Sequence, residues 1–330
     1  MSGSQRTVSV GIPVYNGGEY LCTCLESILG QTFSDFEVVA VDDCSSDESR
    51  NVIDRYAKMD DRVRVFQNSQ NLGLVANWNR CVELARGQWL KFVFQDDWLA
   101  PDCLRLMVED AGKTGALLTV CRREYVFEDV STEFRKRYPA VGQELSPGTV
   151  FPGKGLISPV EVCNAVLDRG VINFVGEPTA TLIDRDAFRR FGVFNHRLIQ
   201  WCDLEYWLRL AVNQGLSYIP EPLAFFRVHQ NSTTSRNFNG RSFRGDIVDP
   251  LLVRCELAYN PHFQALRDVA AVRGIDLEAE FLRASINEQS WGEEHANRGW
   301  GQAIATEPRL RMPWPLRLRR IGRNFSEKLR

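Results

Sequence analysis

Two adjacent carboxylates, Asp96 and Asp97, follow a run of apolar and aromatic residues that predicts a buried strand at 89–94. In an open α/β sheet, ligands bind beyond the carboxyl ends of the strands. Carboxylates at such a strand end are well placed to hold a hard divalent cation, which in turn binds a diphosphate. An isolated Asp-Asp pair is more often a solvated turn, so the other polar residues of the chain decide between the two interpretations.

Three further groups of side chains fit the same chemistry. Asp42 and Asp43 end a second predicted strand at 36–41. Asp203 lies near the start of a predicted helix, and His229 ends a late strand. Displacing a diphosphate leaving group requires a Lewis acid such as Mg²⁺ or Mn²⁺ to neutralise its charge. An attacking hydroxyl must also lose its proton to a carboxylate on the opposite side of the reacting atom. A metal-binding carboxylate at one strand end and a base on a distant helix meet both needs.

Strands and helices alternate four times in the first 120 residues, as hydrophobic periodicity indicates. Strands are expected at 8–14, 36–41, 62–67, 89–94 and 116–121, and helices at 19–29, 48–58, 74–85 and 102–113. This alternation predicts a mainly parallel sheet with helices on both faces. Polar loops at 13–18, 42–47, 68–73 and 95–98 should then lie at one edge, where a nucleotide is the natural ligand. The sequence contains neither GxGxxG after the first strand nor GxxxxGK[ST], so phosphate charge must be met chiefly by a metal.

Beyond residue 125 the pattern changes. Residues 125–155 are charged, contain Pro and Gly and lack periodicity, which indicates a long loop or flap, with solvated disorder as the alternative. A capped helix, a strand, a helix and a strand are expected at 158–168, 175–183, 199–212 and 223–229. The polar segment 231–244 is typical of a domain exit and precedes two or three amphipathic helices. We therefore expect a catalytic domain at 1–235, a helical extension at 236–305 and a basic tail at 306–330.

The composition is that of an ordinary globular protein. The chain has 330 residues, 44% of them hydrophobic and 25% charged, so a sizeable core is expected. No run approaches the roughly 18 apolar residues that a membrane-spanning helix requires. The nine cysteines show no metal-ligand spacing, and the polar start MSGSQRT does not resemble a secretion signal. We expect free thiols and a cytoplasmic location.

Charge is concentrated in the last residues. Residues 309–330 contain seven Arg and one Lys against one Glu, a balance of +7, so the rest sums to −9 for a formal total of −2. Leu318, Ile321, Phe325 and Leu329 recur at steps of three and four residues, which predicts a basic amphipathic helix. Such a segment suits the anionic inner face of a membrane. A helix packed on the catalytic domain, or a tail bound to an acidic partner, is an equally good alternative. Nucleic acid is disfavoured, because no recognition motif accompanies the patch.

Several motifs occur in a fixed order from Val8 to His229, about two thirds of the chain: VSVGIPVYN, SILGQTFSDFEVVAVDDCSSD, NLGL followed by NR, QDDWLAPD, CDLEYWLRL and FRVH. Together they resemble family 2 of the inverting nucleotide-sugar glycosyltransferases, whose α/β fold is the GT-A type. The resemblance implies transfer of a hexose or N-acetylhexosamine from a nucleotide-diphosphate sugar, for which we expect UDP, with Mn²⁺ or Mg²⁺ as cofactor. It also implies, as acceptor, a hydroxyl of a glycan or of a lipid-linked acceptor in polysaccharide biosynthesis.

The same resemblance assigns roles to individual residues. Asp96 corresponds to the metal-binding Asp of the DxD motif, and His229 to a histidine that completes the metal shell in some relatives. Asp203 corresponds to the Asp of the ED motif, which acts as general base. Binding of the nucleotide base and ribose is assigned to Pro13, Tyr15 and one of Asp42 and Asp43, of which we favour Asp43. The other residues assigned to the nucleotide sugar are Asn16, Asn71, Gln95 and Asp97.

Two positions depart from the family pattern. Phe94 stands where DxD has its first carboxylate, so one ribose or metal contact is either missing or supplied by Gln95. Cys202 replaces the Glu of the ED motif, and Glu205 should face about 200° away from Asp203 on a helix. A non-catalytic nucleotide-sugar-binding protein is therefore an alternative. A sugar nucleotidyltransferase is another, although GIPVYNGGEY lacks the basic residue that such an enzyme would use for phosphate.

Other conspicuous residues are expected to be structural. We expect Glu177, in GEPTA, to be structural, and contact with the donor sugar is the less favoured alternative. Trp78, Trp89, Trp201 and Trp207 are expected to pack in the core or beside the acceptor, although one near Asp203 would be able to stack on a sugar ring.

Overall fold

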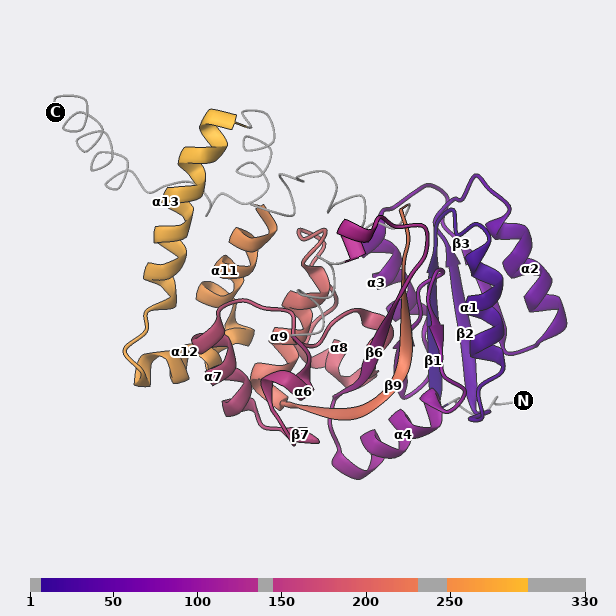
Figure 1. Cartoon of the computed structure of the whole chain (residues 1–330), viewed down its shortest axis with the longest axis horizontal. Helices are drawn as coiled ribbons and strands as arrows, with labels where there is room; N and C mark the ends of the chain where they lie inside the picture. The colour runs from indigo at the N-terminus through magenta and orange to yellow at the C-terminus, as the bar shows by residue number, and fades with distance from the viewer. Residues whose placement is uncertain (1–6, 136–144, 231–247, 296–330) are drawn as a thin grey trace. The chain divides into compact units, whose positions relative to one another are not determined.

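The computed structural model describes residues 7–135, 145–230 and 248–295 (Figure 1). The chain divides into two compact units. The sheet unit comprises residues 1–196 and 202–240, and the helical unit comprises residues 197–201 and 241–330. Within the described ranges, no helix is long and apolar enough to cross a membrane. The predicted basic tail at 306–330 lies outside them.

Among the described residues, the sheet unit is built on a nine-stranded mixed sheet. Its strands are β1 (Val8–Val14), β2 (Phe36–Asp42), β3 (Val63–Gln67), β4 (Trp89–Phe92), β5 (Trp98–Leu99), β6 (Leu118–Phe127), β7 (Leu156–Ile157), β8 (Thr181–Asp184) and β9 (Leu216–Val228). Their order is β3-β2-β1-β4-β8-β6-β9-β5, with β7 paired to β9. The first four strands of this order are parallel, as are β6 and β9. β8, β5 and β7 run antiparallel to their neighbours.

Helices cover both faces of this sheet, as the alternation predicted (Figure 1). The helices of the sheet unit include α1 (Tyr20–Leu29), α2 (Ser49–Met59), α3 (Leu74–Leu84), α4 (Cys103–Thr114), α6 (Pro147–Val150), α7 (Pro159–Arg169), α8 (Arg185–Phe191), α9 (Cys202–Gln214) and the short 3₁₀ helix η1 (Pro178–Ala180). On one face, Leu25 of α1, Ile53 of α2 and Leu104 of α4 share a buried core with the strands. α3 lies on the other face, where Trp78 packs against Phe92 with the ring centroids 6.1 Å apart.

Several predicted boundaries are wrong. The strand expected at 223–229 begins at Leu216, and the strand expected at 175–183 covers only Thr181–Asp184. β4 ends at Phe92 rather than at residue 94, because the chain enters a turn in which the Asp97 N–H donates to the Phe94 carbonyl at 3.0 Å. β6 continues to Phe127 because β9 pairs with it from Thr119 to Phe127. The expected loop at 125–155 is therefore shorter, and it also contains α6, whose N-terminus is closed by a capping box between Ser146 and Thr149.

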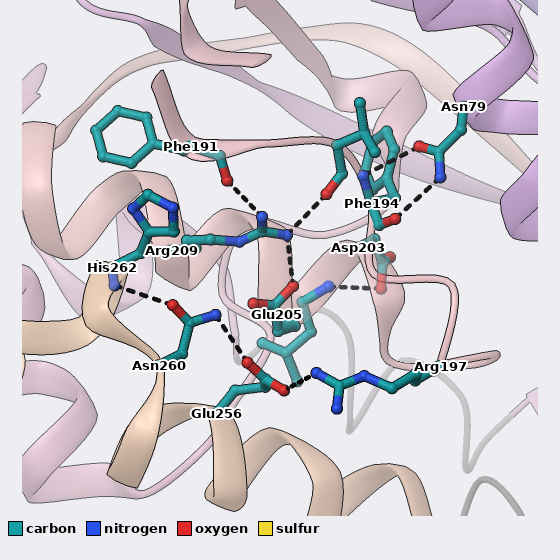
Figure 2. Close-up of polar contacts among 12 residues, drawn as sticks. Asn79, Phe191, Phe194, Arg197, Asp203, Glu205, Arg209, Glu256, Asn260 and His262 are labelled. Atoms are coloured by element: carbon teal, nitrogen blue, oxygen red, sulfur yellow. Dashed lines mark hydrogen bonds and ion pairs between the residues drawn. The ribbon is translucent and has the colours of Figure 1, made fainter. Parts of the chain in front are cut away.

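The core assignments of two tryptophans are confirmed. Trp78 of α3 and Trp207 of α9 are both buried. Both rings lie edge-on to Phe194, with centroid distances of 5.4 Å and 6.1 Å. Asn79 adds a polar link, because its amide donates to the Phe194 carbonyl at 2.9 Å and accepts from the Phe194 N–H at 3.0 Å (Figure 2). α3 thus anchors Phe194 within the sheet unit.

The helical unit consists of α11 (Asp249–Tyr259), η3 (Pro261–Phe263), α12 (Gln264–Val272), α13 (Leu277–His295) and the segment 197–201. Most of α11 is buried, including the carboxylates of Asp249 and Glu256. Asp249 Oδ2 accepts from three consecutive N–H groups, those of residues 199, 200 and 201, at 2.9, 2.6 and 3.2 Å. Glu256 forms an ion pair with Arg197 at 2.5 Å (Figure 2). Both carboxylates therefore fasten the segment 197–201 to α11.

Candidate active site

Asp43 organises the loop that follows β3. Its side chain is 2% exposed. Oδ1 accepts from the Asn68 amide and from the Leu72 N–H, each at 2.8 Å, and Oδ2 accepts from the Gly73 N–H at 2.9 Å. Asn71, in the same loop, accepts from the Gly73 N–H at 2.9 Å and is itself exposed. The carboxylate therefore shapes the loop from within, and the loop presents Asn71 to the outside.

Asp42 is fully buried at the end of β2. It accepts from the Ser45 N–H at 3.2 Å and from the Gln67 amide at 3.1 Å. Pro13 lies beside this strand end, buried in β1 and in register with Val41. Both predicted nucleotide-binding residues thus lie at the carboxyl ends of neighbouring parallel strands, where the sequence placed them.

The loop after β1 is held from two sides. The Gln95 amide accepts from the Tyr15 N–H at 2.8 Å and donates to the Tyr15 carbonyl at 3.0 Å. On the other side, the Asn16 N–H donates to the Ser45 hydroxyl and the Asn16 side chain accepts from the Ser46 N–H, each at 2.9 Å. Tyr15 remains 48% exposed. Gln95 therefore ties the first loop to the turn that carries Asp96.

Asp96 and His229 meet in the sheet unit although they lie 133 positions apart in the sequence. Asp96 Oδ2 lies 3.2 Å from His229 Nε2, with side-chain exposures of 21% and 12%. Antiparallel pairing of β5 with β9, in which Trp98 faces Phe225, brings the two segments together. The two residues to which the resemblance assigns a metal are thus neighbours in the structure.

This pair suits Mn²⁺ or Mg²⁺ in the chemistry of its donor atoms. Carboxylate oxygens are the usual ligands of both ions, and imidazole suits the transition metals. No cluster of three or more potential metal ligands occurs among the described residues. Mg²⁺ is commonly bound in proteins through only one or two carboxylates, so Asp96 and His229 would be enough to hold a divalent ion here.

Asp97 lies next to Asp96 in the chain but has a different environment. It is 1% exposed, and it accepts from the Thr179 hydroxyl at 2.5 Å and from the Arg227 N–H at 3.1 Å. Burial, and then the neighbouring charge of Asp96, raise the pKa of Asp97 well above its usual range. Both of its oxygens contact the protein itself, so Asp97 connects the turn to β9 and η1.

Asp203 is the second residue of α9 and is partly buried. Burial raises the pKa of its carboxyl to about 7. The hydrogen bond from the Leu204 N–H, 2.6 Å from Oδ1, opposes this rise, and the charge of Glu177 reinforces it. A carboxylate whose pKa lies near neutrality is well suited to general-base catalysis.

Glu205 is the competing carboxylate on α9. It is fully buried and forms an ion pair with Arg209 at 2.7 Å. Arg209 also donates to the carbonyls of Phe191 and Val193, at 2.5 and 3.0 Å (Figure 2). Because Glu205 is engaged in this buried network, Asp203 is the better candidate for the base.

The sequence did not predict the cluster around Glu177, which interacts electrostatically with Asp203. Glu177 pairs with Arg123 of β6 and accepts from the Tyr125 hydroxyl at 3.3 Å. The preceding Gly176 has φ +96°, and a Cβ atom there would lie 2.2 Å from the Arg123 guanidinium. Its carbonyl accepts from the Trp207 indole at 2.9 Å. The glycine before Glu177 was the one available signal, because Arg123 lies in an unremarkable strand.

Known proteins share both the sequence pattern and the fold. The profile of Glycosyl transferase family 2 matches residues 9–173. The chain is 36% identical over 235 residues to the putative glycosyltransferase EpsH of Bacillus subtilis, and this alignment covers 69% of this chain and 63% of EpsH. Among solved structures, S. aureus TarS 1-349 in complex with UDP-GlcNAc superposes with a TM-score of 0.62 at 18% identity, covering 93% of this chain and 82% of TarS 1-349. Mannosyltransferase PcManGT from Pyrobaculum calidifontis, in complex with GDP-Man and Mn²⁺, gives a TM-score of 0.55 at 16% identity, covering 95% and 83%. The predicted GT-A type fold is thereby confirmed.

Proposed function

Because the chain belongs to glycosyltransferase family 2, we propose that it is a metal-dependent inverting enzyme that transfers a sugar from a UDP-sugar to a hydroxyl group. The observation that carries the proposal is the contact of Asp96 with His229, 3.2 Å apart at the end of β9. A carboxylate and an imidazole at the carboxyl edge of an α/β sheet form a site for a cation that binds diphosphate. The sugar is a hexose or N-acetylhexosamine, and the acceptor is a glycan or a lipid-linked molecule.

Three of the predicted residues act on the reacting groups themselves. Asp96 and His229 would hold Mn²⁺ or Mg²⁺, and the bound ion would supply Lewis-acid neutralisation of the leaving diphosphate. Asp203 removes the proton from the acceptor hydroxyl, which requires its carboxyl group to be ionised at the moment of attack. Its pKa of about 7 leaves a large ionised fraction near neutral pH.

The donor nucleotide occupies the loops that follow β1, β2 and β3. The exposed Tyr15 ring and the exposed Asn16 and Asn71 side chains provide its contacts, on a framework that Asp42 and Asp43 hold rigid. TarS in complex with UDP-GlcNAc and PcManGT in complex with GDP-Man support a nucleotide-sugar donor. We favour UDP as the nucleotide of the donor. A screen of UDP- and GDP-sugars would distinguish it from GDP.

The domain division and the tail belong to the same proposal. Residues 1–235 form the catalytic domain, residues 236–305 extend it with helices, and residues 306–330 bind an anionic membrane surface. A lipid-linked acceptor gives that contact a purpose, because the enzyme would meet its substrate at the cytoplasmic face of the bilayer. The support for the tail is its charge balance of +7 over residues 309–330.

The test is hydrolysis and transfer with a panel of UDP- and GDP-sugars, with Mn²⁺ or Mg²⁺ and with excess EDTA. We expect turnover with one donor class and a divalent ion, and loss of turnover in EDTA. Asp96→Ala should abolish turnover, whereas the exposed control Asp61→Ala should not. Full activity in EDTA would contradict the role of the metal. Tight UDP binding without turnover of any donor would favour a non-catalytic binding protein.

A further inference from the structure

Arg227 lies beside the Asp96–His229 pair, and its guanidinium is enclosed by two aromatic rings. The guanidinium carbon lies 4.4 Å from the centroid of the Tyr20 ring and 4.7 Å from that of Trp98. Tyr20 is the first residue of α1, and Trp98 is the first residue of β5. Only 9% of the Arg227 side chain is exposed. A desolvated cation between two aromatic faces is a strong and directional interaction.

The same residue forms hydrogen bonds to the turn that carries Asp96. Its Nε–H donates to the Asp96 carbonyl at 2.9 Å, and its backbone N–H donates to Asp97 Oδ1 at 3.1 Å. Its remaining charge is met by Glu128, with which one terminal nitrogen forms an ion pair. Arg227 therefore fixes both the main chain of Asp96 and the neighbouring carboxylate.

Arg227 is also connected to His229, the second member of the pair. The two residues are separated by Val228 at the end of β9. The His229 ring packs on Tyr20, with the ring centroids 4.8 Å apart, so one aromatic ring contacts both the guanidinium and the imidazole. Tyr20, Arg227 and His229 thus form one packed unit, to which the Asp96 carbonyl is hydrogen-bonded.

We propose that Arg227 is a positioning residue that holds Asp96 and His229 in contact before a cation binds. The inference rests on the proposed function, since it assigns the pair to a divalent ion. A site with two protein ligands from distant segments loses affinity if the segments must be ordered on binding. Arg227 orders them in advance, and Glu128 offsets a positive charge that would otherwise repel the cation.

Lysine cannot replace Arg227 in this role. An ammonium group has no planar face to place between Tyr20 and Trp98, and it cannot direct one N–H to a carbonyl and another to Glu128 in a fixed fork. Groups that orient metal ligands typically change metal affinity by about 10–100-fold when mutated. We expect Arg227→Lys to weaken Mn²⁺ binding by this factor.

The experiment measures Mn²⁺ affinity by electron paramagnetic resonance on the full chain in the presence of UDP. UDP affinity in EDTA and the unfolding midpoint are measured in parallel. Arg227→Lys should weaken Mn²⁺ binding, and raise the Mn²⁺ concentration required for half-maximal activity, while the other two quantities stay near wild type. Arg105→Lys, at an exposed ion pair on α4, is the matched control and should change none of them.

If Arg227→Lys does not fold, Glu128→Gln serves instead, because it removes the countercharge from a partly exposed position. It should weaken Mn²⁺ binding several-fold. Unchanged Mn²⁺ affinity in a folded variant, with normal binding by the wild type, overturns the positioning role alone. A wild type that binds no Mn²⁺ with UDP present overturns the proposed metal site, and the positioning role with it.

Discussion

Replacing Asp203 by Asn should remove the base while preserving the shape of the side chain. A general base typically contributes about 10²–10⁴-fold to the rate, so Asp203→Asn should lower kcat by about that factor and leave UDP affinity near normal. In the wild type, kcat should rise with pH through about 7, because burial raises the pKa of Asp203 to that value and the ionised form accepts the proton.

The same substitution should change the dependence of stability on pH. The pKa of Asp203 is raised from 3.8 to about 7 in the folded chain. A shift of about three units corresponds to about 4 kcal/mol. Because the folded pKa is the higher one, this stabilisation is fully present below the unfolded pKa and is lost as pH rises through the folded pKa. Between about pH 5 and about pH 8, the free energy of unfolding of the wild type should fall by about 3 kcal/mol relative to that of Asp203→Asn. The reason is that about two of the three pH units between the unfolded and the folded pKa lie above pH 5.

Urea unfolding of both proteins at the two pH values measures this difference, and the other titrating groups cancel in the comparison. Glu205→Gln is the control, because Glu205 is buried against Arg209. If the wild type and Asp203→Asn lose the same free energy of unfolding between the two pH values, burial does not raise the pKa of Asp203 as argued. If Glu205→Gln abolishes turnover and Asp203→Asn does not, the base has been assigned to the wrong carboxylate.

Three further substitutions test other parts of the structure. Asp43→Ala removes the acceptor of three hydrogen bonds and should weaken UDP binding at least tenfold in calorimetry, with Asp61→Ala unchanged. Asp249→Ala leaves three N–H groups without their acceptor and should lower the free energy of unfolding by about 3 kcal/mol in urea, and a loss below about 0.5 kcal/mol would contradict this. Deleting 309–330 should abolish sedimentation with anionic vesicles at low salt, because each cation near the surface contributes about 1 kcal/mol. Equal binding by the full-length and the truncated chain would indicate a structural role for the tail.

The first half of the fold was predictable because its elements follow the periodicity of the sequence. Val8, Val10 and Ile12 alternate toward a buried face, and parallel strands with crossover helices leave few other topologies. The antiparallel strands β5, β7 and β8 were not predicted as such. Two of them have only two residues, too few for periodicity to be recognised, and their direction depends on pairing with distant segments.

Adjacent carboxylates show where sequence reasoning about the site ends. Asp96 and Asp97 are equivalent by composition, yet one contacts His229 and the other is buried against Thr179. The different environments of the two carboxylates depend on the direction of the turn after β4. Residues of β9 and η1, far away in the sequence, determine that direction. The assigned roles of all the site residues in binding and catalysis stay predictions.

The turn 176–180 connects the two ends of the proposed reaction. At one end, the Thr179 hydroxyl donates to Asp97, and the buried Lys91 ammonium donates to the Thr179 carbonyl at 2.5 Å. At the other end, the Gly176 carbonyl accepts from Trp207 of α9, the helix that carries Asp203. An in-line displacement requires the base and the leaving group to lie on opposite sides of the sugar, at a fixed separation. If the proposed reaction is right, a short turn bonded at both ends would restrain that separation, although Asp96 and Asp203 belong to different elements.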